Sequence, residues 1–262
     1  MKAYAKPGKN VLLVKVRNDY SMLGGEGVPR RWGNKLSASN SPGWDDPFSG
    51  WSCCPTGYGI YQDVYVVAKE TPFIADLFCR PLLDRKAVEL WVETDLPNGE
   101  EAGDFLVTYS LYGQNFEAEV IKDKKKQMPV EGGRVLSKAL VVIPDTLLRI
   151  WSPEEPWLYQ MQVTLSSNDG RRILDTRKQQ FGMRSFELRA DSRPKGRMYL
   201  NGKEIRLRGA NTMGFLQLDV MHHDWNRLCD DLLLAKLTNM NFIRTTQRIM
   251  PKEVYEYADR LG

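Results

Sequence analysis

Apolar and polar residues alternate in short runs from residue 10 to about residue 185, which is the period expected of β-strands. Turn signals rich in Gly, Pro and Asn separate the runs, and residues 168–170 (Asn-Asp-Gly) join two of them as a hairpin would. Because no long helical period interrupts the alternation, the pattern predicts a β-sandwich. The expected strands are residues 11–16, 61–67, 87–93, 105–112, 139–143, 159–166 and 172–180.

The segment from Asn18 to Gly59 departs from this alternation. It is rich in Gly and Pro and poor in aliphatic residues, yet it contains Trp32, Trp44 and Trp51. Loops of this length are uncommon in compact domains and are usually functional or mobile. The three indole rings are candidates for stacking on the apolar faces of sugars, and the alternative is that they pack the loop onto the sandwich.

Beyond residue 195 the period lengthens. Residues 198–208 predict a small hairpin that leads into Gly209-Ala-Asn211. Asp224 is a good helix N-cap, and apolar residues at 225, 228, 229, 232 and 235 predict an amphipathic helix that ends near Asn239. A buried strand at 241–245 and a second helix from Pro251 follow. This order is typical of the start of an α/β unit with a parallel sheet.

Two strands of a parallel sheet neither close a barrel nor bury both faces. We therefore expect the sequence to be a fragment that is truncated at both ends. The uncovered β/α part is also expected to cause self-association of the isolated chain.

Composition excludes several classes of protein. The 37 Lys and Arg against 33 Asp and Glu give a net charge of +4, spread along the chain without a basic stripe, so nucleic-acid binding is not expected. No apolar run is long enough to span a membrane. The lysine-rich run at 122–126 is interpreted as a solvated loop.

Candidate metal ligands are few. The four cysteines lack the spacing of a zinc site, since Cys53 and Cys54 are adjacent. The pair His222 and His223 is interpreted as part of a solvated loop at the helix entry rather than as a metal site. We therefore expect neither a metal nor a cofactor.

Several segments, in one order along the chain, resemble the signature motifs of glycoside hydrolase family 2. Trp151–Tyr159 resembles W-S-P-x-x-P-x-L-Y, Phe181–Arg184 resembles F-G-F-R, and Arg208–Asn211 resembles R-G-V-N. Further similarities are found at residues 7–11, 59–64, 200–203 and 241–245. Together these segments extend over almost the whole chain.

The resemblance implies three parts. Residues 1–67 would be the C-terminal part of a sugar-binding jelly-roll domain, with the long aromatic loop. Residues 68–185 would be an immunoglobulin-like sandwich, and residues 186–262 the first two β/α units of a TIM-barrel catalytic domain. The expected fold is therefore mainly β, followed by an incomplete (β/α)8 barrel.

The resemblance also implies a retaining β-glycosidase with a carbohydrate substrate. That chemistry uses two carboxylates about 5–5.5 Å apart. In the family they lie on the fourth and seventh barrel strands, so no catalytic residue is expected in this chain, which by itself should be inactive. Arg244 matches the family's arginine on the second barrel strand, and Asn211 ends the first strand. Both are expected at the rim of the substrate site, although an internal ion pair for Arg244 and a turn role for Asn211 are the alternatives.

At some positions the residue differs from that of the family motif. Met213 and Gly214 stand where the galactosidase and glucuronidase branches have His and Glu, Gln247 stands at another His, and Gln62 replaces an Arg. The resemblance therefore does not carry over a substrate class. The alternative function is a non-catalytic carbohydrate-binding or scaffolding module that uses Trp32, Trp44 and Trp51.

Overall fold

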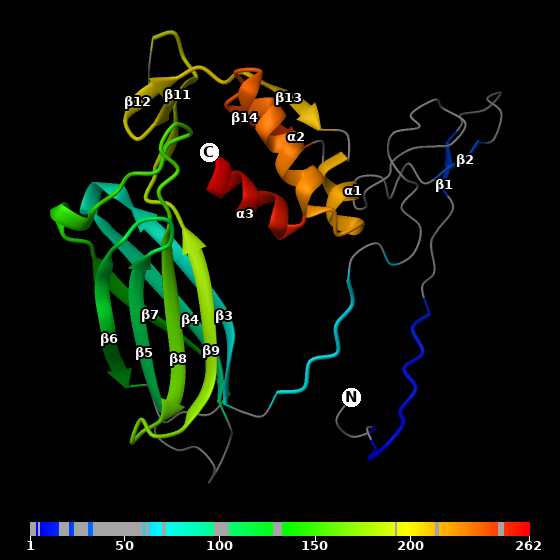
Figure 1. Ribbon diagram of the computed structural model, residues 1–262, viewed down its shortest axis with the longest axis vertical. Coiled ribbons are helices and arrows are strands. Elements are labelled where there is room, and N and C mark those ends of the chain that lie inside the picture. Colours follow the sequence, from blue (N-terminus) through cyan, green and yellow to red (C-terminus); the bar gives the residue numbers. More distant parts are fainter. Residues whose placement is uncertain are drawn as a thin grey trace. The chain divides into compact units, whose positions relative to one another are not determined.

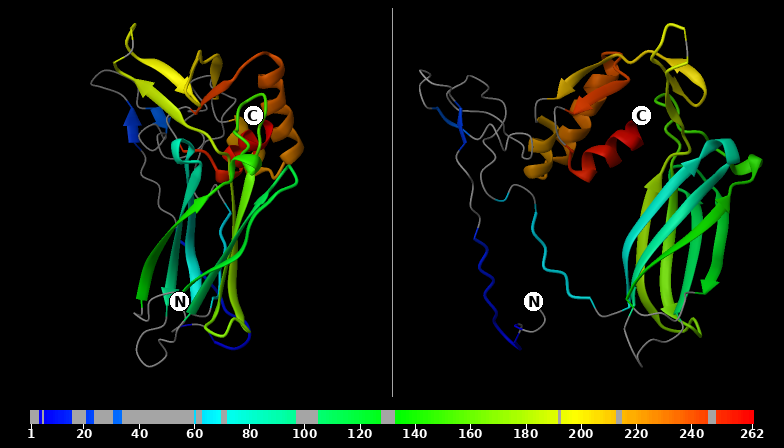
Figure 2. Two further views of the ribbon diagram at one scale, coloured as in Figure 1. Left: turned by 90° about the vertical axis from the view of Figure 1, so that its left-hand side faces the viewer. Right: turned by 180° about the vertical axis from the view of Figure 1, so that it is seen from behind.

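The alternating part of the chain folds into two antiparallel sheets packed face to face (Figures 1 and 2). The computed structural model describes residues 4, 6–15, 21–23, 31–33, 60, 63–69, 72–96, 105–127, 133–191, 193–212, 215–245 and 249–262. The chain divides into two compact units. The sandwich unit consists of residues 66–210, 228–243 and 252–262, and the second unit of residues 1–65, 211–227 and 244–251.

Within the described residues, seven strands make the sandwich. The first sheet has the order β3-β4-β7 and the second has the order β6-β5-β8-β9, with every neighbouring pair antiparallel. Because β7 returns to the first sheet after β5 and β6 have entered the second, the chain crosses between the layers rather than winding each sheet in turn. The strands are β3 (Phe73–Leu82), β4 (Ala87–Leu96), β5 (Phe105–Gly113), β6 (Glu119–Gln127), β7 (Gly133–Val142), β8 (Tyr159–Ser167) and β9 (Ile173–Phe181).

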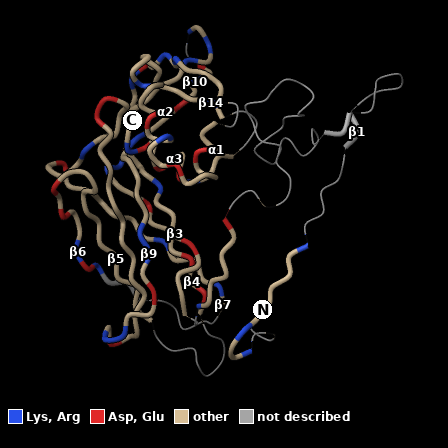
Figure 3. Tube along the Cα trace, turned by 45° about the vertical axis from the view of Figure 1, so that its right-hand side comes forward, with Lys and Arg blue, Asp and Glu red and all other residues tan. Residues whose placement is uncertain are grey.

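The core lies between the two sheets and follows from the period of two. In β8 the side chains of Tyr159, Met161, Val163 and Leu165 point inward and are fully buried. The first sheet supplies the opposite wall. Other buried core residues include Ile74, Leu77, Cys79, Val88, Leu90, Val92, Val107, Tyr109, Leu111, Val141, Ile143, Phe181 and Met183. Charges of both signs are interspersed along the strands (Figure 3).

The strands expected at 87–93, 105–112, 139–143, 159–166 and 172–180 are confirmed as β4, β5, β7, β8 and β9. The expected hairpin at residues 168–170 joins β8 to β9, with Gly170 in the left-handed region at φ +71°. The strands expected at 11–16 and 61–67 are wrong for the described residues, because 11–15 and 63–67 carry no strand and are exposed. Alternation alone does not make a strand where no neighbouring strand accepts its hydrogen bonds.

The interpretation of the lysine-rich run as a loop is also wrong. Lys122, Lys124, Lys125 and Lys126 lie in β6, where Lys124 is paired with Tyr109 of β5. Since β6 is an edge of its sheet, the lysines have a structural explanation. Charged side chains on an edge strand oppose pairing with a further chain.

Beyond the sandwich the expected elements are confirmed, with additions. The hairpin is formed by β11 (Arg197–Leu200) and β12 (Lys203–Ile205), and β10 (Phe186–Arg189), which was not expected, pairs with β11. The strands β13 (Gly209–Thr212) and β14 (Phe242–Thr245) are neighbours in one sheet. The helices are α1 (Phe215–Met221), also not expected, α2 (Trp225–Leu237) and α3 (Lys252–Leu261).

Local signals explain where α2 begins and ends. The Asp224 carboxylate accepts the backbone N–H of Arg227 at 3.0 Å, as an N-cap does. At the other end Asn239 is left-handed (φ +63°), and the N–H of Met240 donates to the carbonyl of Ala235 at 3.0 Å. This is the hydrogen bonding of a Schellman motif, in which Asn substitutes for Gly.

In the second unit β1 (Ser21–Leu23) and β2 (Arg31–Gly33) form a short antiparallel pair. The helix α1 buries Leu216, Gln217 and Asp219, and the carboxylate of Asp219 lies 3.3 Å from the guanidinium of Arg227. Among the described residues, no helix is long and apolar enough to cross a membrane.

Because the thiol of Cys79 is buried, the stability of the fold is expected to vary with pH in the alkaline range. Burial raises the pKa of this thiol from 9.0 to about 12. Below pH 9 the thiol is protonated in both states, and at higher pH the unfolded chain loses the proton first. The free energy of unfolding should therefore fall as pH rises from about 9 to about 12, by up to ~1.4 kcal/mol per pH unit from this group.

Urea unfolding at about pH 8 and about pH 10.5 measures this effect. Cys79→Ala should be less stable at the lower pH but should lose less stability between the two. Burial also raises the pKa of Tyr109 and of Tyr159, and these tyrosines are present in both proteins, so they contribute to both slopes. Equal slopes in the two proteins would contradict the prediction.

Candidate functional site

The strands β13 and β14 approach each other closely because of one glycine. A Cβ built on Gly209 would clash with the backbone carbonyl of Phe242 in β14. Glycine is therefore required by the spacing of the backbones rather than by an unusual φ. This accounts for the glycine of the Arg-Gly-Ala-Asn segment.

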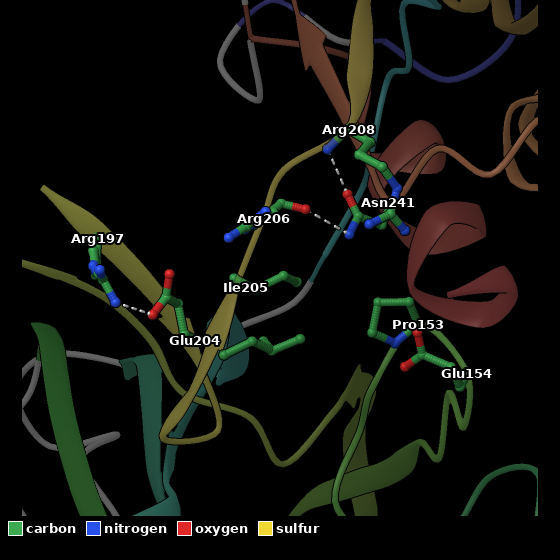
Figure 4. A pocket seen from close by; sticks show the side chains of 9 residues that line it. Pro153, Glu154, Arg197, Glu204, Ile205, Arg206, Arg208 and Asn241 are labelled. Atoms are coloured by element: carbon green, nitrogen blue, oxygen red, sulfur yellow. Dashed lines mark hydrogen bonds and ion pairs between the residues drawn. The ribbon is translucent and has the colours of Figure 1, made fainter.

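The side chain of Asn241 fastens the beginnings of the two strands together (Figure 4). Its Oδ1 accepts the backbone N–H of Arg208 at 2.8 Å, and its Nδ2 donates to the carbonyl of Arg206 at 3.1 Å. The backbone N–H of Asn241 also donates to the carbonyl of Arg208 at 2.9 Å. The amide thus extends the strand pairing by one residue, which explains why an asparagine precedes Phe242.

Two of the residues expected at the substrate rim are brought together. Arg244, on β14, donates from Nη1 to Oδ1 of Asn211, on β13, at 3.2 Å. Both side chains are exposed, so the guanidinium keeps solvent-facing N–H groups after this hydrogen bond is made. A guanidinium oriented in this way is suited to a planar anion such as a carboxylate.

Of the three tryptophans expected to bind the substrate, only Trp32 lies within the described residues. The backbone of Trp32 lies in β2, paired with Met22. Trp44 and Trp51 lie outside the described residues, as do Met213, Gly214 and Gln247. The stacking role of the tryptophans and the effect of the departures from the family motifs therefore stay predictions.

The pocket in Figure 4 lies at a different place in the fold from the Asn211–Arg244 pair. It has a volume of about 520 Å³, and it is lined by Pro153, Glu154, Arg197, Leu200, Glu204, Ile205, Arg206, Arg208 and Asn241. Its strand-flanking residues, 206, 208 and 241, all precede β13 and β14, whereas Asn211 and Arg244 lie in the second halves of these strands. Barrel chemistry occurs at the carboxyl ends of strands, so this pocket is not the expected catalytic side.

The two histidines are exposed, as expected. Nε2 of His223 lies 3.5 Å from Oδ1 of Asp63, and its ring meets Trp225 edge-on with the centroids 5.7 Å apart. The described part of the chain contains no group of three or more His, Cys, Asp or Glu side chains that could hold a metal ion.

The two segments with the clearest signatures, 151–159 and 181–184, lie next to each other. The backbone N–H of Trp151 donates to the carbonyl of Met183 at 3.0 Å. A Cβ on Gly182 would lie only 2.8 Å from both Cβ and Cγ of Trp151. The glycine of the Phe-Gly-Met-Arg segment is therefore required because the tryptophan occupies the space of a side chain.

Gly182→Ala is expected to destabilise the chain by about 1–3 kcal/mol, because the added methyl group forces Trp151 to move. Urea unfolding measures the change. A double-mutant cycle with Trp151→Ala identifies the cause, since the added methyl should cost little once the indole is gone. An unchanged cost of Gly182→Ala in the Trp151→Ala background would contradict the steric explanation.

Sequence patterns did not reveal the partners of Arg184 or Asn241. Arg184 forms an ion pair with Asp259, 75 positions further along the chain, with Nη1 and Oδ1 2.7 Å apart. The only feature of the sequence that singled out Arg184 and Asn241 was their position within the family motifs. A motif indicates that a residue matters, but it does not indicate what the residue touches.

Comparison with known proteins shows a match between part of the chain and one family model. Residues 73–184, from the start of β3 to Arg184, match the family model described as Glycosyl hydrolases family 2. A β-galactosidase of Priestia megaterium is 29% identical over 220 residues, and one of Alteromonas mediterranea is 26% identical over 216 residues. Each match covers 78% of this chain and 19% of the relative, so the chain spans about a fifth of their length.

Solved structures have a similar fold. A β-glucuronidase of Bacteroides uniformis superimposes with a TM-score of 0.63 at 24% identity, covering 82% of this chain and 26% of that chain. A β-glycosidase of Bacteroides vulgatus gives a TM-score of 0.59 at 21% identity, with 79% and 25% covered. At these identities the likeness supports the fold alone.

Proposed function

We propose that the chain, whose residues 73–184 match the model of Glycosyl hydrolases family 2, is part of a retaining glycosidase that hydrolyses O-glycosidic bonds in carbohydrates. The observation that carries the proposal is the family match over residues 73–184. The name of the curated relatives, β-galactosidase, supports the proposed class of reaction.

The proposed division of labour leaves the bond cleavage outside this chain. A retaining enzyme needs an acid/base carboxylate and a nucleophilic carboxylate about 5–5.5 Å apart. The family resemblance puts both on later barrel strands, so we assign neither role to an Asp or Glu of this chain. The domain layout proposed from the resemblance is a jelly-roll part over 1–67, an immunoglobulin-like sandwich over 68–185 and a barrel start over 186–262.

Arg244 is the chain's own contribution to the chemistry. Its guanidinium, oriented by Asn211, would donate hydrogen bonds to the nucleophilic carboxylate. Hydrogen bonds and positive charge favour the ionised form of a carboxyl group, which is the form that attacks the sugar. Asn211 would hold the guanidinium in the plane that this contact needs.

The test is hydrolysis of p-nitrophenyl β-glycosides by the full-length protein and by the 262-residue chain. We expect the full-length protein to release p-nitrophenol from a β-galactoside or a β-glucuronide, and the shorter chain to release none. Failure of the folded full-length protein on both, with sugar binding retained, would instead favour the non-catalytic carbohydrate-binding function.

A further inference from the structure

The proposed chemistry does not use the most distinctive side chains of the two signature segments. Trp151 and Arg184 instead converge on one residue of α3. Nε1 of Trp151 donates to the backbone carbonyl of Asp259 at 2.7 Å, and Nη1 of Arg184 lies 2.7 Å from the carboxylate of the same residue. The Arg184 guanidinium also lies over the Trp151 ring, 4.3 Å from its centroid. The three groups therefore hold one another.

The strength of this contact comes from its geometry. The Arg184–Asp259 pair is short and charge-assisted, and its side chains are 36% and 23% exposed, so solvent screens it less than a surface pair. Stacking on an indole adds a cation–π attraction. The tryptophan is itself held, because Nδ2 of Asn201 donates to its carbonyl at 2.9 Å.

A second contact joins α2, α3 and the loop after Trp151. Nζ of Lys236 donates to the carbonyl of Pro153 at 2.6 Å and to the carbonyl of Leu261. Leu261 ends α3, where backbone carbonyls lack partners within the helix and carry partial negative charge. The ammonium thus stabilises the helix end and links it to the sandwich. A Cβ on Gly262 would clash with the Pro153 carbonyl, so the chain also passes close by here.

A third contact joins Gln180 to Glu256 and Arg260 of α3. Nε2 of Gln180, on β9, donates to the carbonyl of Glu256 at 3.0 Å, and Oε1 of Gln180 accepts Nε of Arg260 at 3.0 Å. The same Oε1 accepts Nε2 of Gln114 at 3.0 Å. Gln180 is 9% exposed, and a buried amide is tolerated only when it is hydrogen-bonded in this way. Its partners come from both the sandwich and the helix.

We propose that Trp151 and Arg184 of the two signature segments, together with Gln180, Lys236 and Asp259, form a docking clamp that binds α3 to the end of the sandwich. The clamp makes the sandwich a fixed support of α3. The division of the chain agrees, since the sandwich, most of α2 and all of α3 fall into one compact unit. The clamp needs no catalytic activity, so it stands or falls independently of the proposed glycosidase function.

Hydrogen exchange of the 262-residue chain tests the clamp, with the amides of α3 compared with those of β8. Arg184→Ala and Asp259→Asn should each speed exchange in α3 by about tenfold, the loss expected for one charge-assisted hydrogen bond. Exchange in β8 should stay unchanged. The double variant should be no faster than either single variant, because both remove the same interaction. Arg177→Ala, an exposed arginine of β9, is the matched control and should leave α3 unchanged.

The reversed pair Arg184→Asp with Asp259→Arg should recover part of the lost protection in α3. Unchanged α3 exchange in both single variants would overturn the clamp. Equal loss of protection in β8 and α3 would also overturn it, because Arg184 would then stabilise the sandwich as a whole. If Arg184→Ala fails to fold, Asp259→Asn still decides, since that residue lies on the helix and outside the sandwich core.

Discussion

Replacing Arg244 with alanine in the full-length enzyme is expected to lower kcat/KM for an aryl β-glycoside by about 10²–10³-fold, the loss typical when one preorganised donor is removed from an active site. The guanidinium lies on β14 and is oriented by the Asn211 amide oxygen at 3.2 Å. If its remaining N–H groups hold the nucleophilic carboxylate ionised, their removal raises the pKa of that carboxyl group and weakens the nucleophile. Steady-state hydrolysis of a p-nitrophenyl glycoside, with pH profiles of both proteins, measures this.

One further variant separates charge from geometry, and a second serves as a control. Arg244→Lys keeps the charge but loses the planar fork, so it should recover only part of the rate. Arg206→Ala is the matched control, because Arg206 precedes β13 at the opposite end of the strand pair from Arg244. A folded Arg244→Ala variant with activity within about threefold of the parent would remove Arg244 from the catalytic account; threefold corresponds to about 0.7 kcal/mol.

The largest stability effect is expected at Tyr159, in the last position of the Trp151–Tyr159 segment. Its ring is fully buried, stacks on Phe181 with centroids 5.6 Å apart and meets Phe116 edge-on at 5.1 Å. Its hydroxyl donates to the carbonyl of Leu147 and accepts the N–H of Arg149, both at 2.7 Å. Tyr159→Ala removes the ring and both bonds, and should cost about 3–5 kcal/mol.

Tyr159→Phe isolates the hydroxyl. It leaves the Arg149 N–H and the Leu147 carbonyl without their partner, which should cost about 1–3 kcal/mol. Tyr112→Phe on β5 is the control, because that ring is partly exposed, and it should change stability by less than about 0.5 kcal/mol. Urea unfolding of the 262-residue chain measures all three variants. A cost for Tyr159→Phe no larger than that of the control would show that the hydroxyl bonds add nothing.

How much the sequence predicts depends on where each element buries its side chains. β8 alternates cleanly because one face meets the core, and its bounds are predicted to within one residue. β3 was missed because its apolar residues do not alternate cleanly and Pro81 lies near its end, which is tolerated on an edge strand. β6 was missed because an edge strand is protected by lysines, so it has the composition of a loop.

The candidate site also contains some residues that the sequence predicted and others that it did not. The family resemblance led to Arg244 and Asn211, and the structure places them in hydrogen-bonding distance. It did not lead to the Arg184–Asp259 pair, because the ring of contacts around Trp151 exists only after the sandwich and α3 have folded against each other. A sequence motif identifies the residue at each position, but the long-range partners of that residue can be identified only in the tertiary structure.

The most direct test of the central claim is proton NMR of the first sugar released by the full-length protein from an aryl β-glycoside. A retaining family 2 enzyme should release the β-anomer first, with the α-anomer appearing later by mutarotation. Release of the α-anomer first would contradict the proposed mechanism. Absence of any hydrolysis by the folded full-length protein would contradict the glycosidase function itself.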